Sequence, residues 1–283
     1  MRGMTMQTAT VGGATRTYLM YLPESLNPST AAPFVYVFHG AGMSGQQIYG
    51  ITDYAALADR EGVAVVFPDG EGGAGSITPW NVKNPGQNVC GPGNLVSASG
   101  DDFGLMDAMK ANVEKYQCVD PAHIFATGFS MGGYFSHHVA CYRSDIRAAA
   151  PGSGATIPSL SSCTTAHMPI IIFHGTADTL IPPGCDDPNS AAQSGFPASA
   201  TLWAKKNGCA ATYRTVAEEG DGGAGQCYVY DGCPADGQVE LCTFNGMGHC
   251  WAGGTGAGGP GGSCSGYPSA TELEWSFFKK YAW

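Results

Sequence analysis

Short apolar runs alternate with longer amphipathic segments along most of this chain. The runs have the length of buried strands, and the longer segments repeat apolar residues every three or four positions, as helices do. We expect strands at residues 16–22, 34–38, 63–67, 123–127, 148–150, 170–173 and 239–244. We expect helices at residues 46–60, 102–117, 131–141, 199–207 and 271–281. This alternation predicts an α/β fold, with a mostly parallel, doubly wound sheet flanked by helices.

The segments between these elements set the domain organisation. Residues 69–100 form a long Gly-, Pro- and Asn-rich stretch, and loops of that length in a compact domain usually serve a function or are disordered. Residues 220–225 and 253–262 look like linkers by composition, but cysteines and further core-like segments follow each. We therefore expect a single domain over residues 1–283.

The charge of the chain limits the kinds of molecule that it is expected to bind. Only 13% of the 283 residues are charged, the formal net charge is −10, and Lys and Arg form no cluster. Nucleic acids and anionic membranes both require a basic patch, so neither is an expected partner. The sequence holds no apolar run of about 18 residues, the minimum for a membrane-spanning helix. A neutral or weakly polar substrate fits this composition.

Eleven cysteines are more than a reduced cytosolic protein of this size normally carries. Most lie in loops and none forms a C-x-x-C pair, which favours disulfides over zinc and predicts an oxidising compartment. Because the number is odd, at least one thiol should be free or bonded to another chain. The cysteines alone therefore predict a secreted protein, and because residues 1–10 lack the apolar core of a leader, we expect that its signal peptide is not part of this chain.

The sequence Gly-Phe-Ser-Met-Gly at residues 128–132 lies between an expected strand and an expected helix. A G-x-S-x-G motif in that position forms the sharp turn on which the α/β-hydrolase fold presents a nucleophilic serine. Small flanking residues keep the neighbouring backbone from colliding at such a turn. The context therefore predicts that Ser130 is a nucleophile on an α/β-hydrolase fold.

In this fold the chain order of a catalytic triad is Ser, acid, His. Asp178 directly follows the apolar strand at 170–173, where the acid is expected, whereas Asp186 and Asp187 lie further along a Pro-rich loop. His249 follows the last strand and is the only histidine after residue 174. A turn or N-cap role for Asp178 is the structural alternative.

These side chains would supply the chemistry of acyl transfer. His249 would accept the Ser130 proton, while Asp178 would fix the imidazole tautomer and stabilise the imidazolium. The tetrahedral intermediate that leads to an acyl-enzyme needs two N–H donors for its oxyanion, and we assign them to Met131 and to Ala41 in the loop after the strand at 34–38. This mechanism requires no metal or other cofactor.

Several blocks together resemble carbohydrate esterase family one. They are FHGAG at 38–42, ATGFSMGG at 126–133, FHGTAD at 173–178 followed by Ile181-Pro182, NGC at 207–209 and GHCW at 248–251. The family holds secreted feruloyl and acetyl xylan esterases beside related polyhydroxybutyrate depolymerases, and the resemblance spans nearly the whole chain. It implies the same roles for Ser130, Asp178 and His249, and a disulfide between Cys209 and Cys233.

The chain also departs from relatives of this kind. Tannase-like feruloyl esterases place a Cys before the nucleophile, bonded to a Cys after the His, but here Phe129 precedes Ser130. Cys250 is therefore expected to pair elsewhere, for example with Cys185. The His-Cys-Trp sequence at 249–251 also replaces the more usual His-x-Trp-Pro.

The substrate is inferred from three aromatic residues. Trp80, Phe129 and Trp251 would form an apolar slot for a planar phenolic acyl group, or they pack in the core. We expect a feruloyl (hydroxycinnamoyl) esterase that acts on feruloylated or acylated polysaccharide fragments. Acetyl xylan and polyhydroxybutyrate ester hydrolysis are the alternatives.

The sequence also bears on other classes of function. A catalytically inactive binding module usually lacks the serine or the histidine, and both are present here. Transfer of the acyl group to an acceptor other than water would need a second pocket. Asp186-Asp187 and the acidic stretch at 218–221 offer oxygen ligands of the kind that calcium takes, although acidic Gly-rich loops are more often only solvated.

Overall fold

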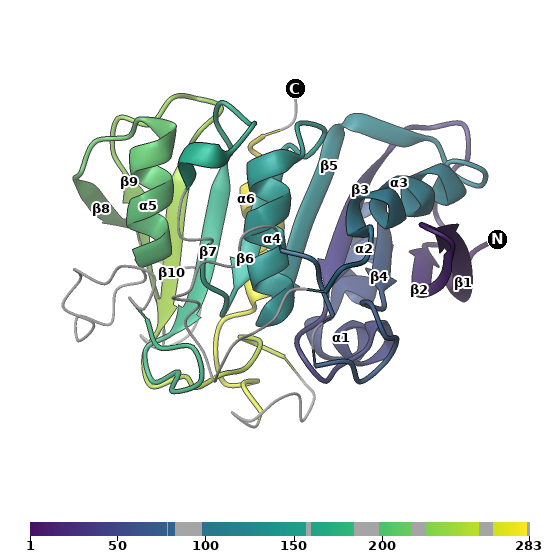
Figure 1. Ribbon diagram of the computed structural model, residues 1–283. Coiled ribbons are helices and arrows are strands. Elements are labelled where there is room, and N and C mark those ends of the chain that lie inside the picture. The colour runs from purple at the N-terminus through teal and green to yellow at the C-terminus, as the bar shows by residue number, and fades with distance from the viewer. Residues whose placement is uncertain are drawn as a thin grey trace.

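The computed structural model describes residues 1–77, 79–82, 98–156, 160–183, 198–216, 225–254 and 263–281. Its described strands form one ten-stranded sheet in the order β1-β2-β4-β3-β5-β6-β7-β10-β9-β8 (Figure 1). The six strands from β4 to β10 in this order are parallel to one another. Antiparallel pairs, β1-β2 and β9-β8, extend both edges. The predicted mostly parallel α/β sheet is confirmed.

The strand bounds show how closely the apolar runs predict the sheet. The strands are β1 Gly3–Val11, β2 Ala14–Leu22, β3 Ala32–Phe38, β4 Ala64–Pro68, β5 Val119–Phe129, β6 Ala148–Gly152, β7 Ile170–Gly175, β8 Tyr213–Val216, β9 Gly225–Tyr230 and β10 Val239–Phe244. Each of the seven expected strands is present, whereas β1, β8 and β9 were not expected.

Helices cover both faces of the sheet, as Figure 1 shows. They are α1 Gly45–Thr52, α2 Tyr54–Glu61, α3 Asp102–Val113, α4 Met131–Tyr142, α5 Ala198–Asn207 and α6 Ala270–Phe278, with a 3₁₀ turn at Leu160–Ser162. Side chains of α3, α4 and α5 share one apolar cluster with the sheet, and those of α1, α2 and α6 share the other. Within the described part of the chain, no helix is long and apolar enough to cross a membrane.

The single helix expected at 46–60 is wrong, because the chain breaks between α1 and α2. Asp53 adopts a left-handed backbone conformation with φ 53°, which ends one helix and begins the next. The Thr52 carbonyl at the break accepts a hydrogen bond from the Thr271 hydroxyl on α6. A tertiary contact therefore offsets the interruption, and the local apolar pattern carries no sign of it.

Four disulfides cross-link the described part of the chain: Cys141–Cys163, Cys209–Cys233, Cys227–Cys242 and Cys250–Cys264. The pairing of Cys209 with Cys233 is the one that the family resemblance implies. The suggested pairing of Cys250 with Cys185 is wrong, because Cys250 bonds to Cys264 and so closes the loop after His249. Cys118 carries an exposed free thiol, as an odd number of cysteines allows.

Candidate active site

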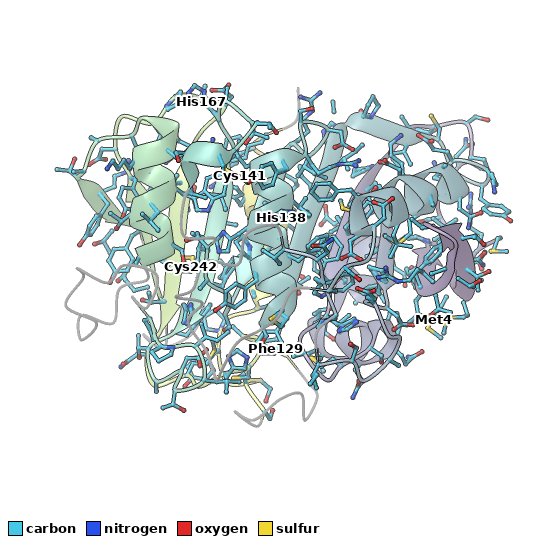
Figure 2. All side chains as sticks on the ribbon, in the orientation of Figure 1. Met4, Phe129, His138, Cys141, His167 and Cys242 are labelled. Carbon is cyan, nitrogen blue, oxygen red and sulfur yellow. A yellow bond between two sulfur atoms is a disulfide. The ribbon has the colours of Figure 1, made fainter. Side chains whose placement is uncertain are left out.

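The turn between β5 and α4 holds Ser130 in an unusual backbone conformation. Its φ of 57° and ψ of −118° lie in a region that residues other than glycine rarely occupy. The chain can turn this sharply only because small residues surround it. A Cβ on Gly128 would lie 2.5 Å from the Gly132 carbonyl oxygen, and one on Gly132 would overlap the Phe38 carbonyl oxygen. The motif thus presents a strained serine at the carboxyl end of β5, where Figure 2 labels the neighbouring Phe129.

Three loops at the carboxyl ends of β5, β7 and β10 bring together Ser130, Asp178 and His249. His249 Nε2 lies 2.8 Å from Ser130 Oγ, and His249 Nδ1 lies 2.7 Å from Asp178 Oδ2. The three residues are 8%, 3% and 4% exposed, in the order Ser130, Asp178, His249. Within this buried relay a proton on Nδ1 can be donated to the carboxylate, which leaves Nε2 free to accept the serine proton.

The Asp178 carboxylate is oriented by four groups. Its Oδ1 accepts hydrogen bonds from the amides of Leu180 and Ile181, each at 2.9 Å. Its Oδ2 faces His249 and lies 3.5 Å from His174 Nε2. Burial would raise the pKa of Asp178, but the hydrogen bond and charge of His249, helped by the Ile181 amide, hold that pKa below its ordinary value. The acid is therefore ionised and oriented at neutral pH.

The backbone beside Ser130 offers two candidate oxyanion donors. The Ser130 amide is engaged with the Gly152 carbonyl oxygen at 2.9 Å, but Met131 begins α4 and its amide has no carbonyl one turn earlier to bind. On the opposite side, a Cβ on Gly40 would lie 3.0 Å from Ser130 Cβ, so the loop containing Ala41 passes next to the hydroxyl. The placement of both expected donors fits the proposed role.

His39 anchors the loop that carries Ala41. The Gly70 amide donates to His39 Nε2 at 3.0 Å, and His39 Nδ1 lies 2.7 Å from the Gly40 carbonyl oxygen. An imidazole that accepts at Nε2 carries its proton on Nδ1 and donates it to Gly40. Burial lowers the pKa of His39, which keeps the ring neutral.

Trp80 does not line a substrate slot in this structure. Its ring is fully buried, stacks on Phe135 with centroids 5.1 Å apart, and meets Phe38 edge to face at 5.2 Å. Its indole N–H donates to the His39 carbonyl oxygen at 2.8 Å. Trp80 therefore belongs to the core and supports the strand end at His39, so the structural alternative is the correct one.

The other two aromatic residues are also buried. Phe129 is 2% exposed, and its ring lies 4.8 Å from the His249 ring, behind the imidazole. Trp251 is 4% exposed, and its indole N–H donates to the Thr271 hydroxyl at 3.2 Å. Together with Trp80, these rings pack in the two cores instead of forming an open aromatic slot.

One further expectation concerns calcium. The possible calcium ligands at 186–187 and 218–221 lie outside the described residues.

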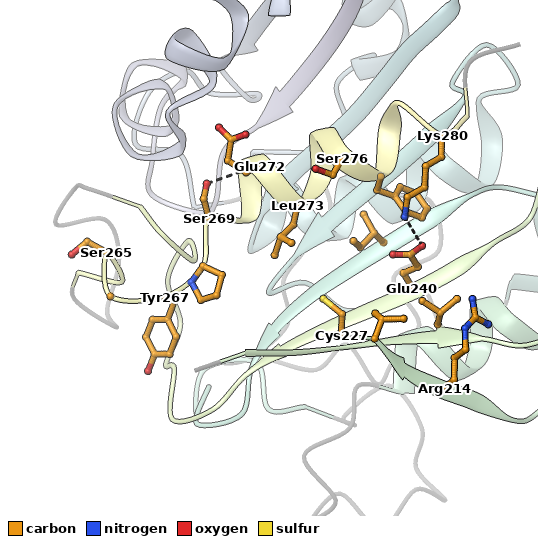
Figure 3. Close-up of a pocket in the computed structure, with 16 residues that line it drawn as sticks. Arg214, Cys227, Glu240, Ser265, Tyr267, Ser269, Glu272, Leu273, Ser276 and Lys280 are labelled. Carbon is orange, nitrogen blue, oxygen red and sulfur yellow. Dashed lines mark hydrogen bonds and ion pairs between the residues drawn. The ribbon is translucent and has the colours of Figure 1, made fainter. Parts of the chain in front are cut away.

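A separate concavity lies between α6 and the β8–β10 edge, with Glu240 and Lys280 in an ion pair of 3.1 Å at one end (Figure 3). Tyr267 lies toward its other end, and none of the triad residues lines it.

Comparison with known families decides the membership of the chain. The sequence model of the dienelactone hydrolase family matches residues 28–192, which is more than half of the chain. The chain belongs to the dienelactone hydrolase family. The matched segment includes Ser130 and Asp178 and ends before His249.

Individual relatives of this dienelactone hydrolase family member confirm the resemblance to feruloyl and acetyl xylan esterases. Feruloyl esterase B of Piromyces equi is 29% identical over 249 residues, which are 83% of this chain and 42% of that protein. A bifunctional acetylxylan esterase/xylanase of Neocallimastix patriciarum is 31% identical over 172 residues, 60% of this chain and 22% of that protein. The chain thus spans less than half the length of these two relatives.

A solved structure confirms the α/β-hydrolase fold. The acetyl xylan esterase from Aspergillus awamori superposes with a TM-score of 0.67 at 17% sequence identity. The superposition covers 98% of this chain and 99% of that structure. Identity this low establishes the fold alone, so the activity has to be argued from the site.

Proposed function

We propose that this chain is a serine carboxylic-ester hydrolase, of the feruloyl (hydroxycinnamoyl) esterase kind, acting through an acyl-enzyme on Ser130. The hydrogen-bonded series of Ser130, His249 and Asp178, with contacts of 2.8 and 2.7 Å, carries this proposal. A catalytically inactive binding module would have no need for a strained serine against a buried imidazole and carboxylate. We further propose that the catalytic domain spans residues 1–283.

The geometry supports a two-step reaction. In the first step, His249 Nε2 takes the proton of Ser130 Oγ as the oxygen attacks the ester carbonyl carbon, and the same proton then passes to the departing alcohol. In the second step, His249 takes a proton from water as the water oxygen attacks the acyl carbon. The bond from that carbon to Ser130 Oγ then breaks, and His249 returns the proton to Ser130 as the carboxylic acid leaves. Asp178 stabilises the imidazolium in both steps, and the Met131 and Ala41 amides receive the developing oxyanion.

The substrate class rests on the relatives, since the expected aromatic slot is closed. The Piromyces relative is named a feruloyl esterase, which favours a hydroxycinnamoyl ester on a plant polysaccharide fragment. The Neocallimastix relative is named an acetylxylan esterase/xylanase, which favours acetyl esters as the second candidate. Polyhydroxybutyrate hydrolysis remains the third, from the motif resemblance alone.

The disulfides support a site of action outside the cell. Four bridges among the described residues require an oxidising environment to form and persist. A polysaccharide-bound ester is also an extracellular substrate. We therefore propose that the protein is secreted and works without a nucleic acid or membrane partner.

A rate comparison on three substrates tests the proposal. Methyl ferulate, acetylated xylan and a polyhydroxybutyrate film are each incubated with the wild-type protein and with Ser130→Ala. We expect the highest kcat/KM on methyl ferulate and no release above background from the variant. Faster acetate release from xylan would replace the feruloyl assignment by the acetyl one. Equal turnover by Ser130→Ala would refute the mechanism.

A further inference from the structure

Two buried histidines lie behind the Asp178 loop, outside the three residues assigned to the chemistry. His174 is the second-last residue of β7, four residues before Asp178, and is 3% exposed. His137 lies on α4, the helix that Ser130 begins, and is fully buried. Burial lowers the pKa of both rings, that of His137 to about 3, so both are neutral at neutral pH. Each ring then carries one proton, and its position follows from its neighbours.

The proton of His137 is fixed by a tryptophan. The indole Nε1 of Trp203 on α5 lies 2.9 Å from His137 Nδ1. An indole N–H can only donate, so Nδ1 must accept, and the single ring proton lies on Nε2. His137 Nε2–H is therefore a hydrogen-bond donor in the protein interior.

The proton of His174 is fixed by two oxygen atoms. His174 Nε2 lies 2.7 Å from the Ile181 carbonyl oxygen and 3.5 Å from Asp178 Oδ2. Both oxygens can only accept, so the proton lies on Nε2 and Nδ1 is left with a lone pair. His174 Nδ1 is therefore a hydrogen-bond acceptor in the protein interior.

The two remaining atoms are complementary. Within the described part of the chain, His137 Nε2 and His174 Nδ1 are both buried and have no partner. By the alternation of β7, His174 points to the same face of the sheet as Ile170 and Ile172, the face covered by α4 and α5, and His137 lies on that side against Trp203 of α5. In agreement, the charge of His174 also lowers the pKa of His137. Buried polar atoms nearly always form hydrogen bonds, directly or through an internal water. One buried donor and one buried acceptor thus remain on neighbouring rings.

We propose that one internal water bridges His137 Nε2–H and His174 Nδ1, and that His137 and His174 are positioning residues for the acid of the triad. The hydrogen bonds then run in one direction, from Trp203 through His137 and His174 to Ile181 and Asp178. This proposal rests on the proposed function, because it concerns the same triad.

The direction of these hydrogen bonds helps to hold the Asp178 carboxylate in position. If His174 carried its proton on Nδ1, its Nε2 lone pair would face the Ile181 carbonyl and the Asp178 carboxylate and repel both. A water that accepts from His137 Nε2–H has two O–H groups to donate, which favours a lone pair on His174 Nδ1 and so disfavours that tautomer. The turn from Asp178 to Ile181, which also supplies two amides to the carboxylate, is thereby held where Oδ2 meets His249.

The proton positions are tested first, on the wild-type protein and without any substrate. Two-bond ¹H–¹⁵N spectra of imidazole-labelled protein distinguish the two neutral tautomers and the cation. We expect His137 and His174 to be neutral with their protons on Nε2. A proton on His174 Nδ1, or a cationic His137 at neutral pH, would overturn the proposal. Because this measurement needs no turnover, it judges the proposal even if no ester is hydrolysed.

Kinetics of matched variants then test the positioning role. His174→Gln places an amide N–H where Nε2–H lies, whereas His174→Leu removes the donor at similar volume. We expect His174→Leu to lower kcat about 10-fold with little change in KM, the scale of one lost buried hydrogen bond, and His174→Gln to restore most of it. His137→Phe should lower kcat similarly and shift His174 to a mixture of tautomers. A His174→Gln variant as slow as His174→Leu, or an unchanged kcat in His137→Phe, would contradict the positioning role.

Discussion

Asp178 shows how much of this site depends on single atoms. One carboxylate oxygen accepts two backbone amides, and the other faces His249 Nδ1 at 2.7 Å. This division leaves the imidazole only one useful tautomer, with its proton toward Asp178 and its lone pair toward Ser130. The buried carboxylate therefore controls the direction in which His249 can move a proton.

Replacement of Asp178 by Asn tests that control. The Asn oxygen can keep the Leu180 and Ile181 amides, so its NH₂ group faces His249 Nδ1 and forces the ring proton onto Nε2. A base with its proton on Nε2 cannot accept one from Ser130, and we expect kcat to fall about 10⁴-fold, as for the same change in other triads. Esterase kinetics and a thermal melt measure the outcome. A kcat within tenfold of wild type, with an unchanged fold, would show that the acid lies elsewhere.

At the scale of elements, the tight contact between β3 and α4 sets the position of the nucleophile. Gly132 touches the Phe38 backbone so closely that an alanine methyl would overlap it. We expect Gly132→Ala to push α4 away from the sheet, with a lower melting temperature and a loss of ester hydrolysis.

Gly50→Ala is the matched control for this substitution. Gly50 lies on an exposed face of α1, where an added Cβ meets no atom within 4 Å. Alanine in a helix should stabilise the fold by about 0.5–1 kcal/mol over glycine and leave activity unchanged. Thermal melts of both variants give the comparison, and a Gly132→Ala variant as stable and active as Gly50→Ala would contradict the close contact.

Helix α6 carries a buried acid whose protonation follows from its burial. The Thr127 hydroxyl lies 2.7 Å from the Ala150 carbonyl oxygen and donates to Glu274 Oε1 at 2.9 Å, and the Tyr54 hydroxyl donates to Glu274 Oε2. Burial raises the pKa of Glu274 to about 8, although these hydrogen bonds from Tyr54 and Thr127 oppose the shift.

This acid predicts a pH dependence of stability. Between its ordinary pKa of 4.5 and a folded-state pKa of about 8, the folded chain holds a proton that the unfolded chain has lost. The contribution of Glu274 to the free energy of unfolding should therefore fall by about 1.4 kcal/mol per pH unit across that window and level off above it. Because buried histidines with lowered pKa values titrate in the same range, the measurement is the difference in unfolding free energy between wild type and Glu274→Gln at several pH values, which should shrink as the pH rises. Glu272→Gln, an exposed position on the same helix, should follow the wild-type pH dependence, and parallel curves for wild type and Glu274→Gln would refute a neutral Glu274.

The sequence predicts an element correctly when the residues of that element alone determine its structure. Strands such as β3 and β4 are continuous apolar runs, and the Gly-x-Ser-x-Gly motif marks its own turn. Strand β1 escaped prediction because it lies at the sheet edge and leaves large residues such as Met4 and Met6 exposed. The break at Asp53 depends on a partner in α6, far along the chain. The pattern of apolar and polar residues within one segment cannot show its contacts with distant segments.

At the scale of the whole molecule, the order of the strands in the sheet brings the three triad residues together. The loops after β5, β7 and β10 meet because these strands are parallel and close in the sheet, so their carboxyl ends share one rim. The Ser, acid, His order and the strand ends together suffice to choose Ser130, Asp178 and His249. The interior histidines give no such signal, because their pairing joins α4, α5 and β7 only after folding.

Disulfides hold the periphery of this sheet. Cys227–Cys242 links β9 to β10, and Cys250–Cys264 closes the loop beyond His249. Loss of a native bridge from a secreted domain typically costs about 2–5 kcal/mol, so we expect strong reductant to lower the melting temperature markedly. Cys118→Ser should show the same drop, because Cys118 is not bonded. Unchanged melting under full reduction, verified by thiol titration, would argue against a stabilising role for the bridges.

The central claim is that Ser130 is a nucleophile activated by His249. A fluorophosphonate probe tests it most directly, since the probe forms a stable bond only with an activated serine. We predict one label per chain, located on Ser130 by peptide mass spectrometry, with ester hydrolysis lost in proportion to labelling and very slow labelling of His249→Ala. Labelling of another residue, or equal rates in wild type and His249→Ala, would contradict the account.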